Sequence, residues 1–397
     1  MHTHRFSTRY RTAILLLTLV LVTVVSIYAV RWAANNSLGS SDFNAYWAAS
    51  RLLLLGRNPC DEQNMLEMEQ AYFDPDRDWV MMVWNPPTLW VLLLPVAWMP
   101  YHVARVVWFI TNVILLLVSC FLLQRVYFST RPIQVLVLFC LVAALFSPVL
   151  ISIIAGQVTF LVLFGLSACL FLISRDRWFL AGAALVLTTP KPHLVMLGLP
   201  YLLLFMAAKR KWRGWTGLAS AGVFCVAVLF ALRPEWAADD GAILNNPPTN
   251  WATPTLGGFL QTRGVGPWVK FAGLGLLALL PIFLYQPDRF APESVTGLLT
   301  LVTIPVTFFG WSYDQSLLLL PIAQVFHWMS APGTTRMERW VVAVLAVAAL
   351  AASMAQRVLA TSEVEYLWVP LAWAGIYALA WALNRQRQAK RTDSQIR

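Results

Sequence analysis

The sequence predicts an all-α polytopic membrane protein, and three observations support that fold class. Hydrophobic residues make up 59% of the chain and charged residues only 12%, with a mean hydropathy of +0.64, whereas soluble domains carry about 25% charged residues. Several apolar runs are longer than the roughly 18 residues that cross a bilayer core. The net charge of +10 comes from short basic clusters between apolar runs. Such clusters encode orientation in membrane proteins and do not indicate nucleic-acid binding.

The first apolar run, residues 12–32, follows a basic head at Met1–Arg11. The run is too long for the apolar core of a signal peptide and lacks a small-residue cleavage site, so we interpret it as a retained helix. Eleven further runs complete about twelve transmembrane helices in a single integral membrane domain over residues 1–397: 103–124, 132–151, 157–173, 178–189, 192–207, 214–232, 268–285, 294–310, 315–330, 340–356 and 366–383.

Basic residues predict the orientation of these spans. If the chain starts in the cytoplasm and alternates, 19 of its 29 Lys and Arg and only 5 of its 19 Asp and Glu fall on the inner side. Because an excess of Lys and Arg marks cytoplasmic loops, we expect a multi-pass protein of the plasma (inner) membrane with both termini in the cytoplasm. The predicted parts are a first outer loop at 33–85, a helical core at 86–232, a second outer loop at 233–267, C-terminal helices at 268–383 and a basic cytoplasmic tail at 384–397.

Two apolar segments do not fit a simple span. Pro86–Met99 is short and interrupted by prolines, and counting it as a span would place the basic cluster Lys209–Arg213 outside. We therefore expect a re-entrant or half-membrane element there. At Pro190-Lys191-Pro192 two prolines flank a charge, and one helix cannot continue through them. This pattern predicts a helical hairpin with its apex near the outer face.

The first outer loop contains an amphipathic pattern between Ser41 and Gly56. Its aromatic residues, including Tyr46 and Trp47, favour a helix that lies along the membrane interface. Asp42 at the start of this helix has two interpretations. It can be a carboxylate that caps the helix N-terminus, or a general base at the membrane surface, directed at an acceptor hydroxyl.

Several short motifs resemble glycosyltransferase family 87, in that family's order along the chain. The opening motif is Asp42-Phe43-x-x-Tyr46-Trp47-Ala48-Ala49-x-Arg51-Leu52, followed by Gly56-x-Asn58-Pro59. The later pieces are Asn85-Pro86-Pro87, Gly156-Gln157-Val158, Ala181-Gly182 to Lys191-Pro192 with the Lys209–Arg213 cluster, Thr255-Leu256-Gly257-Gly258 to Arg263, and Tyr313-Asp314-Gln315 to Pro321. Together they cover about residues 12–325.

The resemblance implies a GT-C-type bundle whose outer loops carry interfacial helices, and a hexosyltransferase that uses a polyprenyl-phosphate sugar, with mannose as the first expectation. It implies inverting transfer to an extracytoplasmic lipid or glycan hydroxyl, with Asp42 as catalytic base and Asp314 as a second carboxylate or orienting group. The outer cations expected at the leaving phosphate are Lys191, Arg263 and Arg51. The residues expected to contact sugar or acceptor are Tyr46, Asn85, Gln157, Tyr313 and Gln315.

Each charged candidate also has a simpler interpretation. Arg51 and Lys191 can extend to lipid headgroups, and Arg263 can be a solvated loop charge. Asp314 can cap the helix that follows it. The chain also departs from the family pattern, because some of its mannosyltransferases carry a histidine pair where this chain has Asp314-Gln315. The identity of the sugar and of the acceptor therefore stays open.

No cofactor and no metal are expected. Asp74-x-Asp76 has a spacing that elsewhere holds a divalent cation, but a lipid-phosphate donor carries one phosphate, so a solvated acidic loop is the favoured interpretation. The histidines have no metal spacing, and the five cysteines predict neither a disulfide framework nor a zinc site. The expected partners are the donor lipid, the lipid or glycan acceptor and membrane lipids. The alternative function is a lipid or solute transporter or flippase. Such a protein is expected to have inverted repeats and charged residues within its spans, and this sequence shows neither.

Overall fold

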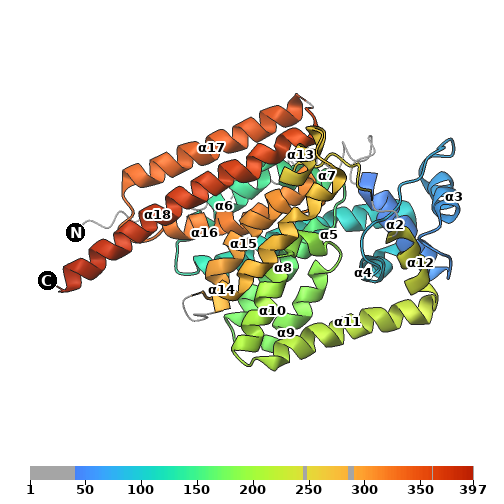
Figure 1. The fold of residues 1–397 in the computed structure, drawn as a ribbon, viewed down its shortest axis with the longest axis horizontal. Coiled ribbons are helices and arrows are strands. Elements are labelled where there is room, and N and C mark those ends of the chain that lie inside the picture. The colour runs from blue at the N-terminus through green and yellow to red at the C-terminus, as the bar shows by residue number, and fades with distance from the viewer. Residues whose placement is uncertain (1–40, 245–247, 285–289, 360, 397) are drawn as a thin grey trace, which may run out of the picture.

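The structure, a computed structural model, describes residues 41–244, 248–284, 290–359 and 361–396. Within these ranges the chain forms helices and no strand, which confirms the predicted all-α class for this part of the protein. The predicted first span, residues 12–32, lies outside the described residues. The long helices run along the longest axis of the molecule, with the end of α18 opposite α2, α3 and α4 (Figure 1).

The described chain contains α-helices and several 3-10 helices, the latter written η. In chain order they are α2 (Ser41–Leu54), α3 (Glu62–Tyr72), α4 (Thr88–Ala97), α5 (Tyr101–Tyr127), α6 (Ile133–Leu145), α7 (Ser147–Ile154), α8 (Thr159–Ile173), α9 (Trp178–Ala184), η1 (Leu185–Thr188), η2 (Pro192–Val195), α10 (Gly198–Ala208), α11 (Trp212–Leu232), α12 (Trp236–Leu244), α13 (Leu256–Thr262), η3 (Pro267–Leu279), α14 (Leu280–Leu284), α15 (Pro292–Val306), η4 (Ser312–Leu318), α16 (Leu319–Met329), α17 (Arg336–Val358), η5 (Glu363–Leu367) and α18 (Trp368–Ile396).

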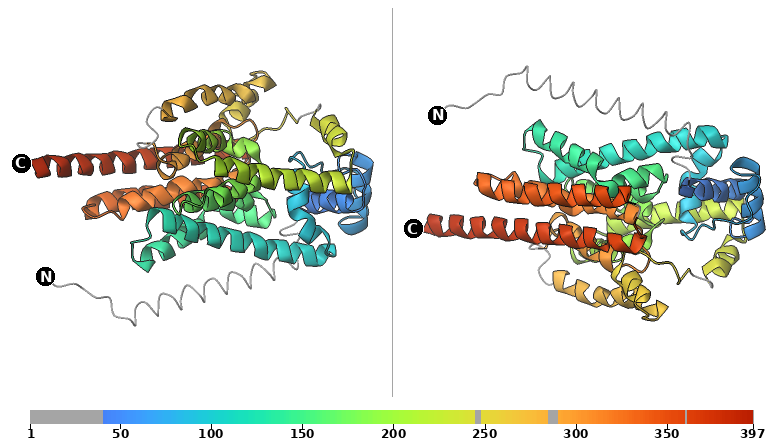
Figure 2. Two further views of the ribbon diagram at one scale, coloured as in Figure 1. Left: turned by 90° about the horizontal axis from the view of Figure 1, so that it is seen from below. Right: turned by 90° about the horizontal axis from the view of Figure 1, so that it is seen from above.

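Four helical segments of the described chain are long and apolar enough to cross a membrane: α5, α11, α17 and Glu363–Lys390, which joins η5 to α18. A fifth span results if α6 and α7, bent by 63° at their junction, are counted as one. Figure 2 shows α17 and α18 side by side in both views, and these two helices pack on each other. The predicted membrane protein is thus supported, whereas the predicted number of about twelve spans is not confirmed.

The other apolar runs of the described chain form helices that are too short to pass as single spans. An α-helix rises 1.5 Å per residue, so the 10 residues of α4 extend about 15 Å, half of a hydrocarbon core of ~30 Å. This length agrees with the half-membrane element predicted at Pro86–Met99. The length of an apolar run does not reveal where its helix breaks, so the lengths of the continuous helices could not be predicted from the runs alone.

Helix α2 is enclosed by protein, although the sequence predicted a helix lying on the membrane surface. Its Phe43 and Trp47 are buried, and the Trp47 ring meets Tyr72 of α3 and Tyr101 of α5 at centroid distances of 5.0 and 5.4 Å. The helix ends ahead of Gly56, whose φ of +69° is left-handed and suits a residue without a side chain. The predicted helix bounds are therefore close, whereas the aromatic residues predicted to lie at the membrane interface pack inside the protein.

The predicted hairpin is present and packs against α11. Helix α9 and η1 lead to Lys191, and η2 and α10 return from it. A Cβ atom on Gly182 would lie 1.7 Å from the carbonyl oxygen of Gly214, and one on Gly217 would lie 1.9 Å from that of Phe179. Backbone therefore meets backbone between α9 and α11, and these glycines make that approach possible.

Candidate active site

Asp314 lies in η4 and is buried, with 1% of its surface exposed. Its Oδ1 accepts hydrogen bonds from Lys191 Nζ at 2.6 Å and from Thr159 Oγ1 at 2.8 Å. Its Oδ2 accepts from the backbone N–H of Trp311 at 3.0 Å. Asp314 is thus the third residue of its own helix, whose N-cap is Trp311, so the simpler interpretation of Asp314 as the N-cap of a following helix is wrong. It also pairs with Lys191. A buried carboxylate requires such partners, because an unpaired charge in the interior is costly.

Lys191 lies at the hairpin apex and is 4% exposed, so it does not extend to lipid headgroups. Besides Asp314, its ammonium group donates to Gln157 Oε1 at 2.8 Å and to Thr159 Oγ1 at 3.3 Å. It also lies 4.7 Å from the centre of the Tyr313 ring, within the range of a cation–π interaction. Three acceptors therefore surround the three donors of this ammonium group.

Gln157 connects the lysine to the first outer loop. It follows Gly156, whose φ is +66°, and its side chain is buried. Its Oε1 accepts from the hydroxyl of Tyr46 at 3.1 Å as well as from Lys191, while its Nε2 donates to Asp42 Oδ2. The amide thus presents its acceptor end to the cation and its donor end to the carboxylate.

Asp42 lies in the first turn of α2, and its backbone N–H donates to the carbonyl of Ala155 at 3.2 Å. Within the described chain no backbone N–H donates to its carboxylate, so the capping interpretation has no support. Burial raises the pKa of the Asp42 carboxyl above its ordinary value, and the charge of Lys191 and the hydrogen bond from Gln157 act in the opposite direction. A carboxylate with a raised pKa is a stronger base than a solvated one.

Most of the predicted site residues meet in this one cluster, which we define as Asp42, Tyr46, Gln157, Lys191, Tyr313 and Asp314, together with Thr159. Asn85 lies next to the cluster, since its Nδ2 donates to the carbonyl of Pro190 at 2.8 Å. These residues come from α2, the segment before α4, the start of α8, the hairpin apex and η4. Segments far apart in the sequence therefore form a single polar centre.

Three predicted site residues are not joined to the cluster. Arg51 is nine residues beyond Asp42 on α2, about 13 Å along the axis, and donates to the carbonyls of Ala97 and Trp98 at the end of α4. Arg263 is exposed, with its guanidinium 5.1 Å from the centre of the Phe259 ring. Gln315 points the other way, and its Nε2 donates to the carbonyl of Tyr366 at 3.0 Å.

Sequence reasoning missed Thr159, whose hydroxyl bonds both members of the ion pair. Its signal was a hydroxyl directly after Gly156-Gln157-Val158, at the first residue of α8. It also missed a second polar group behind η4, where Arg357 and Ser312 both bind Glu363 at 3.2 and 3.1 Å. Nothing in the local sequence links those three positions.

The described residues contain no group of three His, Cys, Asp or Glu side chains arranged to hold a metal ion. In the predicted acidic loop, Asp74 accepts the backbone N–H of Asp76 at 3.3 Å, and both residues are exposed. This turn is the kind that aspartate forms locally in loops. Independence from metals stays a prediction.

The family model of glycosyltransferase family 87 matches residues 84–305, more than half of the chain. The chain belongs to glycosyltransferase family 87. No curated protein and no solved structure matches it. The family 87 match contains Asn85, Gln157 and Lys191, whereas Asp42 and Asp314 lie on either side of it. The predicted membership is confirmed, and it makes the protein a membrane glycosyltransferase.

Proposed function

We propose that this family 87 protein transfers a sugar, mannose in the first instance, from a polyprenyl-phosphate donor to an extracytoplasmic lipid or glycan hydroxyl. The observation that carries the proposal is the cluster that joins the Asp42 carboxylate, through Gln157, to the buried Lys191–Asp314 pair. It provides a basic oxygen and a fixed cation a short distance apart. Sugar transfer from a lipid phosphate needs both groups.

In the proposed step, an acceptor hydroxyl attacks the anomeric carbon of the donor sugar. The new bond joins the acceptor oxygen to that carbon, and the bond from the carbon to the phosphate oxygen breaks with its electron pair. The hydroxyl proton passes to Asp42, and the polyprenyl phosphate leaves. Attack opposite to the leaving group inverts the configuration at the anomeric carbon. Tyr46, Asn85 and Tyr313, next to these groups, are assigned to the sugar and the acceptor.

The phosphate is assigned to the side of Lys191. Negative charge develops on the leaving phosphate oxygen, and a cation held in place before the reaction stabilises it without reorganisation. The 3.3 Å bond from Lys191 to Thr159 is the longest of its three, so it is the first that a phosphate oxygen would replace. For Arg51 or Arg263 to contribute, the side chain would first have to leave the carbonyls of Ala97 and Trp98 or the Phe259 ring.

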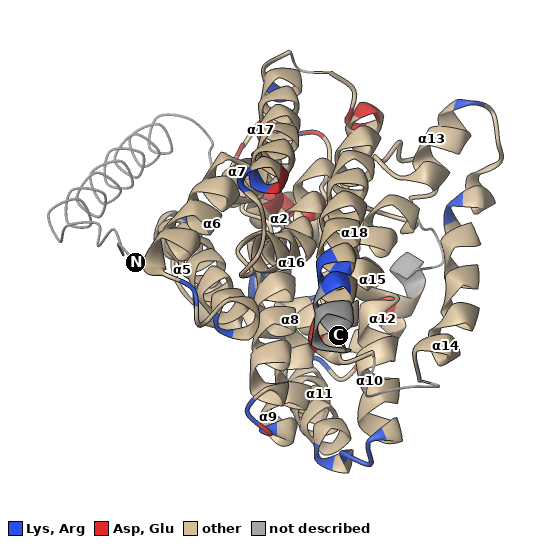
Figure 3. Ribbon diagram, turned by 90° about the vertical axis from the view of Figure 1, so that its left-hand side faces the viewer, with Lys and Arg blue, Asp and Glu red and all other residues tan. Residues whose placement is uncertain are grey.

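The distribution of basic residues supports an outer location for the site. Figure 3 looks onto the end at which α18 terminates, and Lys and Arg gather there in the loops α8–α9 and α10–α11 and on the described C-terminal part of α18. Lys191 lies at the apex of the hairpin, away from the two basic loops, and Asp42 is joined to it through Gln157. If the basic end faces the cytoplasm, the cluster faces the outer side.

The role of Asp42 can be tested with Asp42→Asn. The asparagine keeps an acceptor for the Gln157 amide and serves a helix N-terminus as well as aspartate, but it cannot take up a proton. We expect transfer to fall by about 10²–10⁴, the usual contribution of acid–base catalysis. The assay follows labelled polyprenyl-phosphate sugars incubated with the purified protein and a membrane lipid extract.

Asp76→Asn is the matched control, because Asp76 is an exposed acid of the same outer loop that lies outside the cluster. It should leave transfer unchanged. A folded Asp42→Asn protein with normal turnover would refute Asp42 as the base. The product should carry the anomeric configuration opposite to that of the donor, which nuclear magnetic resonance can determine.

A further inference from the structure

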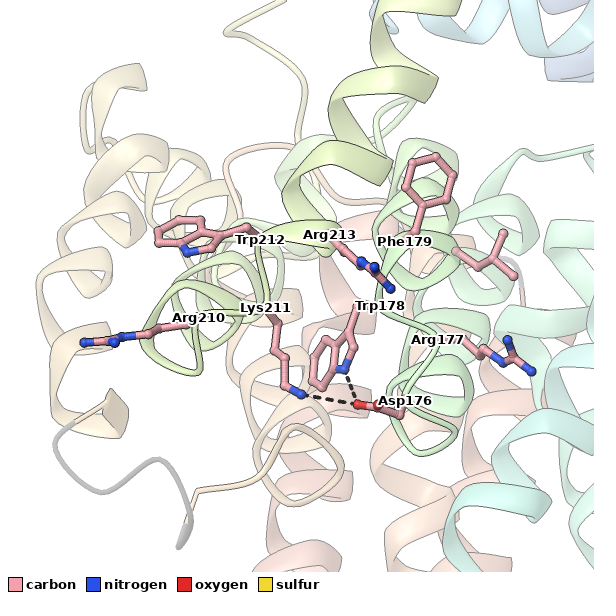
Figure 4. A pocket seen from close by; sticks show the side chains of 9 residues that line it. Asp176, Arg177, Trp178, Phe179, Arg210, Lys211, Trp212 and Arg213 are labelled. Carbon is pink, nitrogen blue, oxygen red and sulfur yellow. Dashed lines mark hydrogen bonds and ion pairs between the residues drawn. The ribbon is translucent and has the colours of Figure 1, made fainter.

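A cavity of about 530 Å³ lies between the loop that leads into α9 and the loop that leads into α11. Figure 4 shows its side chains, which come from two short segments: Asp176, Arg177, Trp178, Phe179 and Leu180, and Arg210, Lys211, Trp212 and Arg213. Four of the nine are cations and one is an acid. The cavity contains none of the residues in the Asp42–Lys191–Asp314 cluster, and the proposed transfer does not use it.

The positive charge of this cavity is largely uncompensated. Asp176 is the single acid, and its Oδ1 accepts from Lys211 Nζ at 3.3 Å and from the Trp178 ring nitrogen. Among the described residues, the guanidinium groups of Arg177, Arg210 and Arg213 have neither an ion-pair nor a hydrogen-bond partner. In Figure 4, Arg213 points into the space beside Trp178, while Arg177 and Arg210 extend at opposite edges. An anion bound there would therefore meet cations on several sides.

The backbone around the cavity is held in position before any ligand binds. The contacts of Gly182 with Gly214 and of Gly217 with Phe179 hold the two segments at one fixed spacing. In addition, Asp176 and Arg210 adopt left-handed φ values of 56° and 53°. Arginine rarely occupies that region, because its side chain crowds the backbone there. The loops need not rearrange to present their charges, so little ordering entropy opposes binding.

The apolar surroundings indicate a ligand with a hydrophobic part. Helix α11, one of the four candidate spans, starts at Trp212, which is 59% exposed. Phe179 and Leu180 beside it are 45% and 52% exposed. Cations next to exposed aromatic and aliphatic side chains, at the end of a span, match the headgroup level of a bilayer, where tryptophan rings also prefer to lie. A soluble anion would gain nothing from these apolar neighbours.

We propose that this cavity binds the headgroup of an anionic phospholipid from the cytoplasmic leaflet. The phosphate lies against Arg213 and Lys211, Arg177 and Arg210 add charge at the edges, and the acyl chains run along Phe179, Leu180 and α11. The site is at the opposite end of the hairpin from Lys191. It shares with the sugar transfer proposed above only the predicted orientation in the membrane, and its failure or success would not affect the assignment of the transfer residues.

The test uses the full-length protein in phosphatidylcholine nanodiscs that contain a photoreactive phosphatidylglycerol. Crosslinked peptides are identified by mass spectrometry, and the phosphatidylglycerol content for half-maximal crosslinking is measured. We expect crosslinks in residues 176–180 and 210–213, displaced by unlabelled phosphatidylglycerol. The variant Arg177→Gln/Arg213→Gln removes two unpartnered charges and no internal contact, so it should fold. It should raise the phosphatidylglycerol content for half-maximal crosslinking about 25-fold, because each basic residue near an anionic surface contributes about a factor of five.

The control is Arg125→Gln/Arg336→Gln, which removes two exposed arginines outside the cavity. It should leave the half-maximal content unchanged. A second variant, Arg177→Lys/Arg213→Lys, keeps the charge and should retain most of the binding. Displacement of the probe by phosphatidylcholine as effective as by phosphatidylglycerol would indicate non-selective lipid contact. Displacement by inorganic phosphate would indicate a site for soluble anions. An effect of the control variant equal to that of the test variant would indicate attraction by the general surface charge. Each of these results would overturn the proposal.

Discussion

Lys191 uses all of its hydrogen-bonding capacity inside the protein. Its three donors face Asp314, Gln157 and Thr159, and its charge is balanced by one buried carboxylate. Removing the lysine therefore has two separate effects. It takes away a cation from the proposed phosphate site, and it leaves Asp314 as a buried acid without a counter-ion.

A single and a double variant separate these effects. Lys191→Met should lower stability by about 3–5 kcal/mol, because it breaks a buried ion pair. The donor efficiency should also fall, by roughly 10- to 150-fold, if a charge-assisted bond worth about 1.5–3 kcal/mol is lost. Lys191→Met/Asp314→Asn removes both charges and should regain much of the stability. Thermal unfolding and kcat/KM for the donor are measured on the same preparation.

Donor efficiency in the double variant decides the role of Lys191. If it stays low while stability recovers, and Asp314→Asn alone keeps its donor efficiency, the lysine acts on the donor. If it recovers together with stability, Lys191 is only a structural partner of Asp314 and the phosphate assignment is wrong. Lys191→Arg should retain part of the activity, since arginine keeps the charge but not the compact shape of an ammonium group.

At the residue scale, the sequence identified most members of the cluster but not their partners. Asp42, Lys191 and Asp314 were recognisable because charged residues are rare next to apolar runs and stand in family-like motifs. That Lys191 binds Asp314 could not be foreseen, since 123 residues separate them. The same limit explains Arg51, whose partners on α4 lie 46 and 47 residues away. Thr159 was overlooked because a hydroxyl at a helix start is common.

At the scale of elements, the contact between α9 and α11 depends on the absence of side chains. Gly217→Ala would place its Cβ within 1.9 Å of the Phe179 carbonyl oxygen, so the two helices would have to separate. We expect a loss of about 1–3 kcal/mol, as for other overpacked sites. The measurement is the midpoint of thermal unfolding in detergent.

Gly222→Ala is the matched control on the same helix, because apart from the adjacent backbone of α11 itself no atom lies within 4 Å of its Cβ position. There the alanine should be neutral or stabilise by up to about 1 kcal/mol, from its better helix propensity. If both variants unfold at the same temperature, the close approach of α9 and α11 does not stabilise the protein.

Helix ends were easier to predict than helix environments. Gly56 and the prolines at 190 and 192 act locally, through the backbone conformations that they permit or forbid, and the structure has breaks at both places. The surroundings of α2 depend instead on its packing against α3, α4 and α5. The local sequence pattern of α2 does not reveal these contacts. Its aromatic residues resembled an interfacial face, but they pack on other aromatic rings inside the protein.

At the scale of the whole molecule, the predicted topology stays open to test. The basic residues predict an outer first loop and an inner loop before α17. In a variant with Cys60 replaced by serine, Asp74→Cys should react with a membrane-impermeant maleimide added to intact cells, and Arg336→Cys should react only after permeabilisation. Both positions are exposed. Reaction of Arg336→Cys but not Asp74→Cys in intact cells would contradict the predicted orientation.

The pairing of Lys191 with Asp314 also constrains the order of events during biosynthesis. Translation proceeds at about 5–20 residues per second, so Lys191 exists for about 6–25 s before Asp314 has been made. Throughout this interval the nascent hairpin has a cation without its carboxylate, and burying it would be costly. The apex can therefore take its final position only after η4 has been synthesised. The polar centre can therefore form only while the last third of the chain is being synthesised or afterwards, however early the hairpin itself forms.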